Sequence, residues 1–400
     1  MKITIAPGPL KESLSSSDAA QAIARGVRKF LPSAELIQVP MADGGEGTAQ
    51  TIAGATGGSL RWAQVCGPLG RPVRASWAAC GDGTTAVVEM ARASGLELLQ
   101  PAERDPMLTS TRGTGELILQ ALDWGATKII VGVGGSATVD GGTGMAAALG
   151  VRFLDAEGRA IADCRGGRLH DIRDVDVTGL DPRLRGVEVI VACDVTNPLT
   201  GPDGAAYTYA PQKGATPEQT EALERGLAHL SDVVRRRLGT DVAGMRGAGA
   251  AGGLGAGLVA FLRARIASGV ETVMQAVGLR EKMSGSSLVI TAEGCIDWQS
   301  AFGKVVSGVA SAAAEQGVPV VALAGSLGPG YEKVYGCGVS ASFAIVNRPM
   351  DLEAALADAD KLLEAAAESV LRFWCAAREK PSGRRRAPGS RRQSKEPAHG

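Results

Sequence analysis

The feature that most constrains this fold is the order of its segments, in which apolar runs are followed by glycine-rich loops and then by helical patterns. The clearest case is KIIVGV at 128–133, which leads into GGSATVDGG at 134–142 and a predicted helix near 142–149. The other apolar runs that read as strands lie at 2–7, 35–41, 187–195, 287–293, 318–324 and 340–346. Strands that alternate with helices predict an α/β fold built on a parallel sheet. In such folds, ligands bind at the carboxyl ends of the strands.

The helical segments have their own start signals. Thr216 and Gln219 form a capping box with Pro217 at the first helical position, and leucines recur at three and four residues through 217–238. The small-residue stretch GAGAAGGLGAGL at 247–258 predicts a tightly packed helix. Further helices are predicted near 18–31, 114–124, 303–316 and 353–378.

The middle of the chain departs from this alternation. Residues 61–90 have the pattern of β-hairpins, with the turn GDGTT before the apolar run AVVEM. We therefore predict one α/β domain made from both chain ends, residues 1–65 plus 286–377. A mixed α/β domain, residues 66–285, is inserted between them.

Charge and composition argue against a nucleic-acid-binding protein. The 42 Lys and Arg residues balance 42 Asp and Glu residues, but residues 378–400 contain eight basic residues against two Glu. That tail is predicted to be disordered and solvated, with at most non-specific contact with nucleic acid. Aromatic residues make up 4% of the chain, too few for a platform of stacked bases.

The cysteines and apolar runs restrict the class of protein further. The seven cysteines lack CxxC spacing and the three histidines lack HExxH spacing, so zinc, iron–sulfur and disulfide frameworks are not expected. The start MKITIAPGP has the pattern of a strand and turn rather than a signal peptide. No apolar run approaches the length of a membrane span, and we expect a cytoplasmic protein.

The glycine-rich loop at 132–142 is the first candidate for a ligand site. Glycines between a strand and a helix expose backbone N–H groups, and the helix dipole adds positive potential. Ser136 and Thr138 add hydroxyl donors. The loop is therefore a candidate phosphate cradle, although it is neither a Walker loop nor a GxGxxG fingerprint. The alternative is a tight turn that only allows close packing.

Acidic and amide side chains follow two other strands. Asp43 and Glu46 lie in MADGGEGT after the strand at 35–41, where they could bind Mg²⁺ or accept a hydroxyl proton. Asp194 lies at the carboxyl end of the strand at 187–195 and Asn197 follows it, and both are candidate oxygen ligands. Lys213 could neutralise a phosphoryl group. The alternatives are an Asp/Gly turn for the first pair and a solvated surface loop for the second group.

A third group lies near the chain ends. Glu293 and Asp297 follow an apolar strand, and Lys304 begins the next helix, a combination that suits phosphate and metal chemistry. The alternative is a capped turn with an ordinary surface lysine. Lys11, in GPLKESL after the first strand, could bind a phosphate or carboxylate, or be a surface lysine.

Together these blocks resemble the family of type I glycerate kinases, which transfer the γ-phosphate of ATP to D-glycerate. The matching stretches occur in the family's order and are IAP with K-x-S-L (5–14), PMADGGEGT (40–48), GPLGRPV (67–73), EMARASGL (89–96), GTGELI (113–118), GVGGSAT-x-DGG (132–142), ACDV-x-NPLTGP-x-GAA (192–206), PQKGAT (211–216), GAGAAGGLGAGL (247–258), EG-x-ID-x-Q (293–299), GK (303–304) and ALAGSLG (322–328).

The resemblance implies a flavodoxin- or Rossmann-like domain and an inserted domain, with the active site in the cleft between them. It also implies ATP and Mg²⁺ as cofactors and 2-phosphoglycerate as product. The residues it marks as catalytic are Lys11, Asp43, Asp194, Glu293 and Asp297. Those it marks for binding substrate or phosphate are Ser13, Glu46, Gly134, Gly135, Ser136, Thr138, Asn197, Lys213 and Lys304. Asp194 and Glu293 are the expected metal ligands.

Eight positions depart from the family's pattern: Gly8, Pro9, Glu12, Arg112, Val139, Ala292, Cys295 and Ser300. Gly8 stands where the family has Asp, and Cys295 where it has Arg, so a carboxylate and a bidentate cation are both lost. Val139 replaces an Asn, and Arg112 replaces a Tyr. Arg112 could compensate for the lost arginine if it reaches the same pocket.

Three functions stay open at this point. The chain could be a glycerate kinase with a reshaped site, a kinase for another small hydroxy acid, or a catalytically silent homologue that binds a ligand or partner. The hydroxyl that is phosphorylated, and the choice between monomer and homodimer, also stay open.

Overall fold

A computed structural model describes residues 1–378 of the chain. The smaller of its two main sheets has five parallel strands in the order β13-β12-β11-β1-β2. These strands are β1 (Lys2–Ile5), β2 (Glu35–Gln38), β11 (Leu288–Ile296), β12 (Val320–Leu327) and β13 (Val339–Ala344). Counted along the chain within this sheet, the order is 2-1-3-4-5, the flavodoxin-like arrangement. Both chain ends therefore build one sheet, as predicted.

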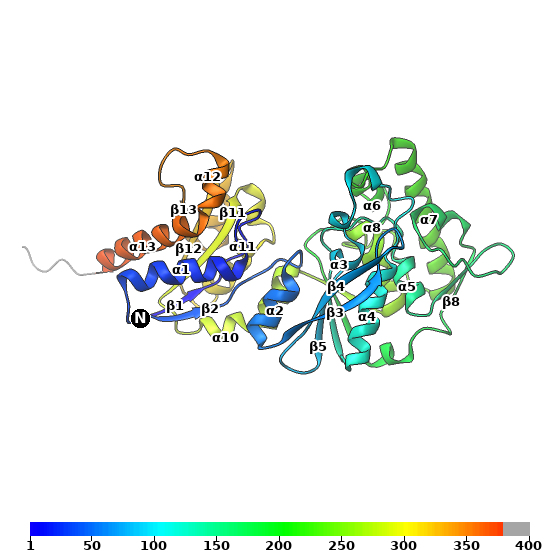
Figure 1. The fold of residues 1–400 in the computed structure, drawn as a ribbon, viewed down its shortest axis with the longest axis horizontal. Helices are drawn as coiled ribbons and strands as arrows, with labels where there is room; N and C mark the ends of the chain where they lie inside the picture. The colour runs from blue at the N-terminus through cyan, green and yellow to red at the C-terminus, as the bar shows by residue number, and fades with distance from the viewer. Residues whose placement is uncertain (379–400) are drawn as a thin grey trace, which may run out of the picture.

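Helices cover both faces of the smaller sheet (Figure 1). On one face, α1 (Ser16–Phe30) and α13 (Ala359–Arg378) pack against each other and over Ile3 and Ile5 of β1. On the other face lie α9 (Gly269–Val277), α10 (Leu279–Met283) and α11 (Val305–Ala314). The predicted helix at 353–378 is two helices, α12 (Leu352–Ala357) and α13.

The larger sheet has six strands in the order β10-β9-β6-β5-β4-β3. They are β3 (Ser59–Cys66), β4 (Pro72–Ala79), β5 (Thr85–Glu89), β6 (Lys128–Gly132), β9 (Glu188–Ala192) and β10 (Arg265–Ala267). The pairs β3–β4 and β4–β5 are antiparallel and the others parallel, so the predicted hairpins at 61–90 are confirmed. The short strands β7 (Arg152–Leu154) and β8 (Asp174–Asp176) pair separately.

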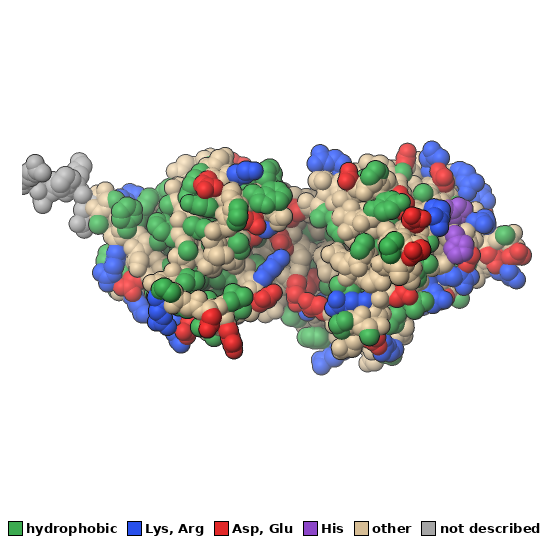
Figure 2. Space-filling model, turned by 90° about the horizontal axis from the view of Figure 1, so that it is seen from above, with side chains coloured by type: hydrophobic (Ala, Val, Ile, Leu, Met, Phe, Trp, Pro, Cys, Tyr) green, Lys and Arg blue, Asp and Glu red, His purple; other side chains and the backbone are tan. Residues whose placement is uncertain are grey.

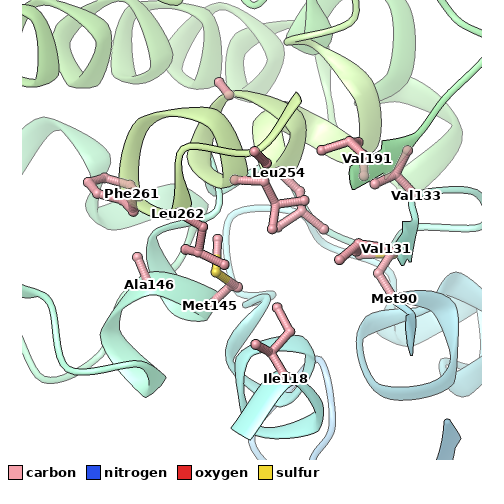
Figure 3. Packing of buried hydrophobic residues seen from close by; sticks show 14 of the residues in the cluster. Met90, Ile118, Val131, Val133, Met145, Ala146, Val191, Leu254, Phe261 and Leu262 are labelled. Atoms are coloured by element: carbon pink, nitrogen blue, oxygen red, sulfur yellow. The ribbon is translucent and has the colours of Figure 1, made fainter. Parts of the chain in front are cut away.

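The core of the larger lobe lies between its sheet and a layer of helices. These helices are α3 (Ala91–Ser94), α4 (Arg112–Trp124), α5 (Thr143–Ala148), α6 (Ala205–Tyr209), α7 (Pro217–Leu238) and α8 (Ala250–Leu262). Figure 3 shows Ile118 of α4, Met145 of α5 and Leu254 of α8 gathered beside Val131 of β6. Helix α7 has the predicted bounds, and both hydrogen bonds of its capping box form.

The glycine-rich first turn of α8 differs from the predicted continuous helix, because the chain is kinked there. Ala251, Gly252 and Gly253 have left-handed backbone angles, with φ of 54°, 66° and 90°. The reason is close packing against the loop at 132–142, because a Cβ on Gly252 would lie 1.9 Å from the carbonyl oxygen of Thr138. The small residues here bring two backbones together rather than forming one regular helix.

The two lobes meet through α2 (Thr48–Thr56), which lies between the sheets (Figure 1), and through α9, which contacts α2, α11 and β9. One cluster of buried side chains joins Val87 and Ile130 of the larger sheet to Val273 of α9 and Val309 of α11. The sequence placed the domain boundaries at 65/66 and 285/286. Because β3 belongs to the larger sheet while α9 and α10 pack on the smaller one, we propose instead that the chain crosses between domains near 39–58 and 268.

Two further predictions concern membrane-spanning segments and the C-terminal tail. Among the described residues, no helix is long and apolar enough to cross a membrane. The basic tail predicted to be disordered lies outside the described residues, apart from Arg378 at the end of α13.

Candidate active site

A cleft of about 1470 Å³ lies between the two lobes. Its walls come from the loops that follow β1, β2, β6, β9 and β11, so the carboxyl ends of both sheets face it. Figure 2 shows the waist between the lobes, with acidic side chains gathered on both sides of it. The smaller lobe contributes Lys11, Ser13 and Lys304 to the lining, and the larger lobe contributes the glycine loop.

The glycine loop reaches the cleft through part of its length. Gly134, Gly135 and Ser136 line the cleft, and Gly135 has a φ of 71°, which favours glycine. Thr138 is fully buried outside the lining, and its carbonyl oxygen, not its hydroxyl, takes part in the site. The loop can therefore offer backbone N–H groups and one hydroxyl to a ligand in the cleft.

Asp140 holds this loop in shape, and it was not among the predicted site residues. It is fully buried, and its carboxylate accepts hydrogen bonds from the backbone and hydroxyl of Thr111 and from the backbone of Gly142 and Gly144. Burial raises the pKa of Asp140, and these hydrogen bonds oppose that rise. A lone acid among glycines was the only signal of this role in the sequence.

Lys213, in the 3-10 helix η5 (Pro211–Lys213), lies at the floor of the cleft. Its side chain is 2% exposed, and Nζ donates to Ser136 Oγ at 2.7 Å and to Thr138 O at 2.8 Å. Burial lowers the pKa of Lys213 to about 7, although the charge of Asp140 acts in the other direction. The alternative of a solvated lysine on a surface loop is wrong for this residue.

Two predicted carboxylates lie in the loops that follow β2 and β9. Asp194 Oδ1 accepts from Ser268 Oγ and from the backbone N–H of Gly269, both at 2.9 Å. Burial raises the pKa of Asp194, these bonds lower it, and the neighbouring charge of Asp43 raises it. Asp43 itself accepts from the N–H of Gly45 at 3.1 Å. Both carboxylates line the cleft.

Glu293, Ser300 and Lys304 form a third cluster, at the end of β11. Ser300 Oγ donates to Glu293 Oε2 at 3.0 Å, and Lys304 Nζ lies 3.5 Å from Glu293 Oε1. Burial raises the pKa of Glu293, and Lys304 opposes that rise. Asp297 accepts from the N–H of Gln299 at 2.8 Å and caps the 3-10 helix η6 (Trp298–Ala301).

Of the four remaining predicted residues, three line the cleft and one does not. Lys11 is exposed and lines the cleft, and Ser13 Oγ donates to Leu356 O at 2.8 Å. Glu46 lines the cleft and pairs with Arg92 at 3.4 Å. Asn197 does not line the cleft, and its amide instead donates to Asp203 O and accepts from the hydroxyl of Tyr209 in α6.

A second pocket, of about 610 Å³, opens at the end of the smaller sheet. Gly8 and Cys295, the two most serious departures from the family's pattern, both line it. Arg112 lines neither this pocket nor the cleft, and its guanidinium pairs with Glu116. The expectation that Arg112 could compensate for the lost arginine is therefore wrong, because Arg112 lies at the start of α4 and its side chain contacts Glu116 on the same helix.

Two residues of the larger lobe beside the cleft were not predicted. Glu89, at the end of β5, is 3% exposed and accepts from the N–H of Ala49 at 2.7 Å. Arg92 lines the cleft and contacts both Glu89 and Glu46. The signal for Glu89 was present, because it ends an apolar strand as Glu293 does.

The donor set fits a metal that is shared with a ligand rather than one held by the protein alone. Within residues 1–378, no group of three or more His, Cys, Asp or Glu side chains could hold a metal ion. Mg²⁺ usually retains water and takes one or two carboxylates together with substrate phosphates. Asp43 and Asp194 offer carboxylates of that kind in the cleft, and Glu293 offers one in the second pocket, which Asp43 also lines.

Comparisons with known proteins agree with one another. A sequence model described as the glycerate kinase family matches residues 3–375. The chain is 51% identical over 346 residues to a glycerate 2-kinase of Escherichia coli K12, covering 86% of this chain and 91% of that one. It is 49% identical over 368 residues to a glycerate kinase of Halalkalibacterium halodurans, covering 92% and 97%. A crystal structure assigned as glycerate kinase 2 of Salmonella typhimurium LT2 superposes with a TM-score of 0.87 at 45% identity, covering 95% of this chain and all of that one.

Proposed function

Because the chain belongs to the glycerate kinase family and is therefore a phosphotransferase, we propose that it transfers the γ-phosphoryl group of ATP to D-glycerate. The bond between the γ-phosphorus and its bridging oxygen breaks, and a bond from a glycerate hydroxyl oxygen to that phosphorus forms. ADP leaves, and the hydroxyl proton is released. The product is 2-phosphoglycerate.

The observation that most supports this proposal is that lysines from both lobes and the glycine loop line the same cleft. Lys213, Ser136 and the glycine loop line it from the larger lobe, and Lys11 and Lys304 line it from the smaller lobe. Phosphoryl transfer needs cations and N–H donors around the transferring group and little covalent chemistry from the protein. Cations on both walls suit two anionic substrates that must meet between the lobes.

We assign roles in keeping with those positions. Lys11 and Lys304 offset the charge of the phosphates, while Lys213 and the glycine loop bind the carboxylate of the acid or the transferred group. Asp43 orients the attacking hydroxyl, because it lines both the cleft and the smaller pocket, where the two spaces join. Holding the two reactants in line increases the rate greatly, because the transfer no longer depends on a bimolecular encounter in the correct orientation.

Asp194 and Glu293 are the residues that would hold Mg²⁺ together with phosphate oxygens. The ion, when bound, supplies positive charge to the β- and γ-phosphates. Burial raises the pKa of both carboxylates, so a bound cation would also favour their ionised forms.

The direct test follows ADP release from ATP by the full chain with Mg²⁺, with and without D-glycerate. Phosphorus NMR of the product distinguishes 2-phosphoglycerate from 3-phosphoglycerate. L-Glycerate, glycolate, lactate and tartronate serve as matched acceptors. Turnover that depends on D-glycerate supports the proposal, and faster turnover with another acid would replace the substrate. Binding of both ligands without turnover would identify a silent homologue.

A further inference from the structure

The strand order of the smaller sheet reverses between β1 and β11. From β1 the chain continues to β2 on one side, and from β11 it continues to β12 on the other. The crevice outside the carboxyl ends of two such strands is where open parallel sheets bind their ligands. The pocket of about 610 Å³ lies there, lined by Gly8–Ser13 after β1 and by Glu293–Cys295 at the end of β11.

The lining of this smaller pocket suits a neutral, partly apolar ligand. Leu10, Val305, Ile345, Met350 and Leu356 form its apolar wall. Pockets of a few hundred Å³ with such walls and a few polar groups hold ligands of nucleoside size. Glycerate has no apolar face to bury there.

The charged side chains of the smaller pocket also favour a neutral ligand over a small anion. The carboxylates of Glu293, Asp297 and Asp351 line the smaller pocket, while its lysines, Lys11 and Lys304, lie where it joins the cleft. A small hydroxy-acid anion inside the pocket would face more acidic than basic side chains. Carboxylates can instead accept hydrogen bonds from the hydroxyl groups of a ribose.

The smaller pocket is continuous with the cleft. Residues 9–13, Asp43 and Lys304 line both spaces, so the two lysines lie at the junction. A ligand with a neutral end in the pocket and an anionic end at the junction would direct that end toward the cleft. Ser136 and Lys213 lie in the cleft and do not line the smaller pocket.

We propose that the smaller pocket binds the adenosine of ATP, with the triphosphate passing Lys11 and Lys304 into the cleft where the acid binds. This inference rests on the proposed function, because it assumes ATP as the donor. It divides the site so that the nucleoside contacts the smaller lobe alone and the acid contacts the glycine loop of the larger lobe.

Cys295 provides a probe of this pocket that does not depend on turnover. It is the one exposed cysteine among the seven, and it lines the smaller pocket but not the cleft. The full chain is treated with a small thiol reagent, and the labelling rate of Cys295 is measured by peptide mass spectrometry. The Cys295→Ser variant gives the background from the other thiols.

Saturating ADP is expected to slow the labelling of Cys295 by at least about tenfold, because only the unoccupied fraction reacts. Adenosine at saturation should also slow it, whereas D-glycerate and tripolyphosphate should not. ADP that binds by calorimetry yet leaves the labelling rate unchanged overturns the assignment of the pocket alone. Protection by D-glycerate without nucleotide overturns it as well. If ADP does not bind and glycerate-dependent turnover is absent, both this assignment and the proposed function fail.

A pair of variants in α12 gives a second test. Ala355 lines the smaller pocket, whereas Ala357, two residues along, is exposed and does not. Ala355→Trp should raise the KM for ATP at least about tenfold and leave the KM for glycerate within about twofold. Ala357→Trp should change neither. A rise in the KM for glycerate alone in Ala355→Trp would place the acid in the pocket and overturn the proposal.

Discussion

Lys213 Nζ donates to Ser136 Oγ over 2.7 Å, across 77 positions of sequence. This hydrogen bond joins η5 to the glycine loop at the floor of the cleft, and a second one from the same nitrogen reaches Thr138 O. An amine this deeply buried loses most of its solvation by water, and the loop supplies hydrogen-bond partners in its place. The lysine can therefore set the shape of the loop and face a bound anion at the same time.

The first prediction is that Lys213→Met lowers kcat/KM for glycerate at least about a hundredfold, the usual effect of removing one charge-stabilising contact. Methionine retains most of the volume and removes the cation and both hydrogen bonds. Steady-state kinetics with ATP at saturation measure the change. Lys361→Met, on the exposed face of α13, is the matched control and should have the same kcat/KM as the parent protein. Parent-like kinetics in Lys213→Met would remove this residue from the site.

The second prediction is that the stability contributed by Lys213 rises with pH. Its pKa is about 7 in the folded protein against 10.5 for an ordinary lysine, so unfolding takes up a proton between these values. The unfolded state then binds more protons, and the free energy of unfolding increases with pH by up to about 1.4 kcal/mol per unit. Below pH 7 both states are protonated and this contribution is flat. Urea unfolding from pH 6 to 10 should show the slope in the parent protein relative to Lys213→Met. Parallel pH profiles of the two proteins would contradict it.

The third prediction concerns Glu293 and its two partners. Glu293→Gln retains the shape but removes the charge that faces Lys304 at 3.5 Å. If Glu293 helps to bind Mg²⁺, this variant should need at least about tenfold more Mg²⁺ for half-maximal rate, with a lower kcat. Titration of the rate with Mg²⁺ at fixed ATP measures the shift.

Ser300→Ala separates the charge of Glu293 from its positioning. Ser300 is fully buried and donates to Glu293 Oε2, so its loss leaves the carboxylate charged but less well held. A smaller shift in Mg²⁺ requirement than in Glu293→Gln is expected. Equal Mg²⁺ requirements in the parent and Glu293→Gln would exclude Glu293 as a metal ligand.

Local patterns predicted the parts of the fold that depend on neighbouring residues. The capping box at Thr216 and Gln219 lies within four residues, and α7 begins and ends where the pattern places it. The strand ends near Asp43, Asp194 and Glu293 were also found, because an acid after an apolar run is visible in the sequence. The parallel sheet then brings such ends to one edge.

Contacts that no local pattern reveals decided where the other candidate residues lie. Nothing in PQKGA distinguishes a lysine buried against Ser136 from one on the surface. Asn197 lies in a loop with the same composition as a binding loop, yet its amide is used by Asp203 and Tyr209. Asp140 was missed because its partner Thr111 comes from another segment.

The last prediction tests whether the backbone of the glycine loop needs its close neighbour. Gly252 has a φ of 66°, and a Cβ there would lie 1.9 Å from Thr138 O, the same carbonyl that accepts from Lys213. Gly252→Ala should destabilise the protein by more than about 3 kcal/mol, or prevent folding, because backbone cannot move aside cheaply. Gly239→Ala is the matched control, since Gly239 has a φ of 71° but nothing within 4 Å of a Cβ. It should cost about 1 kcal/mol, from the left-handed conformation alone. Urea unfolding of both variants measures the difference, and equal losses would mean that the two backbones can separate without cost. In that case the small residues at 251–253 would serve the left-handed turn rather than the shape of the glycine loop.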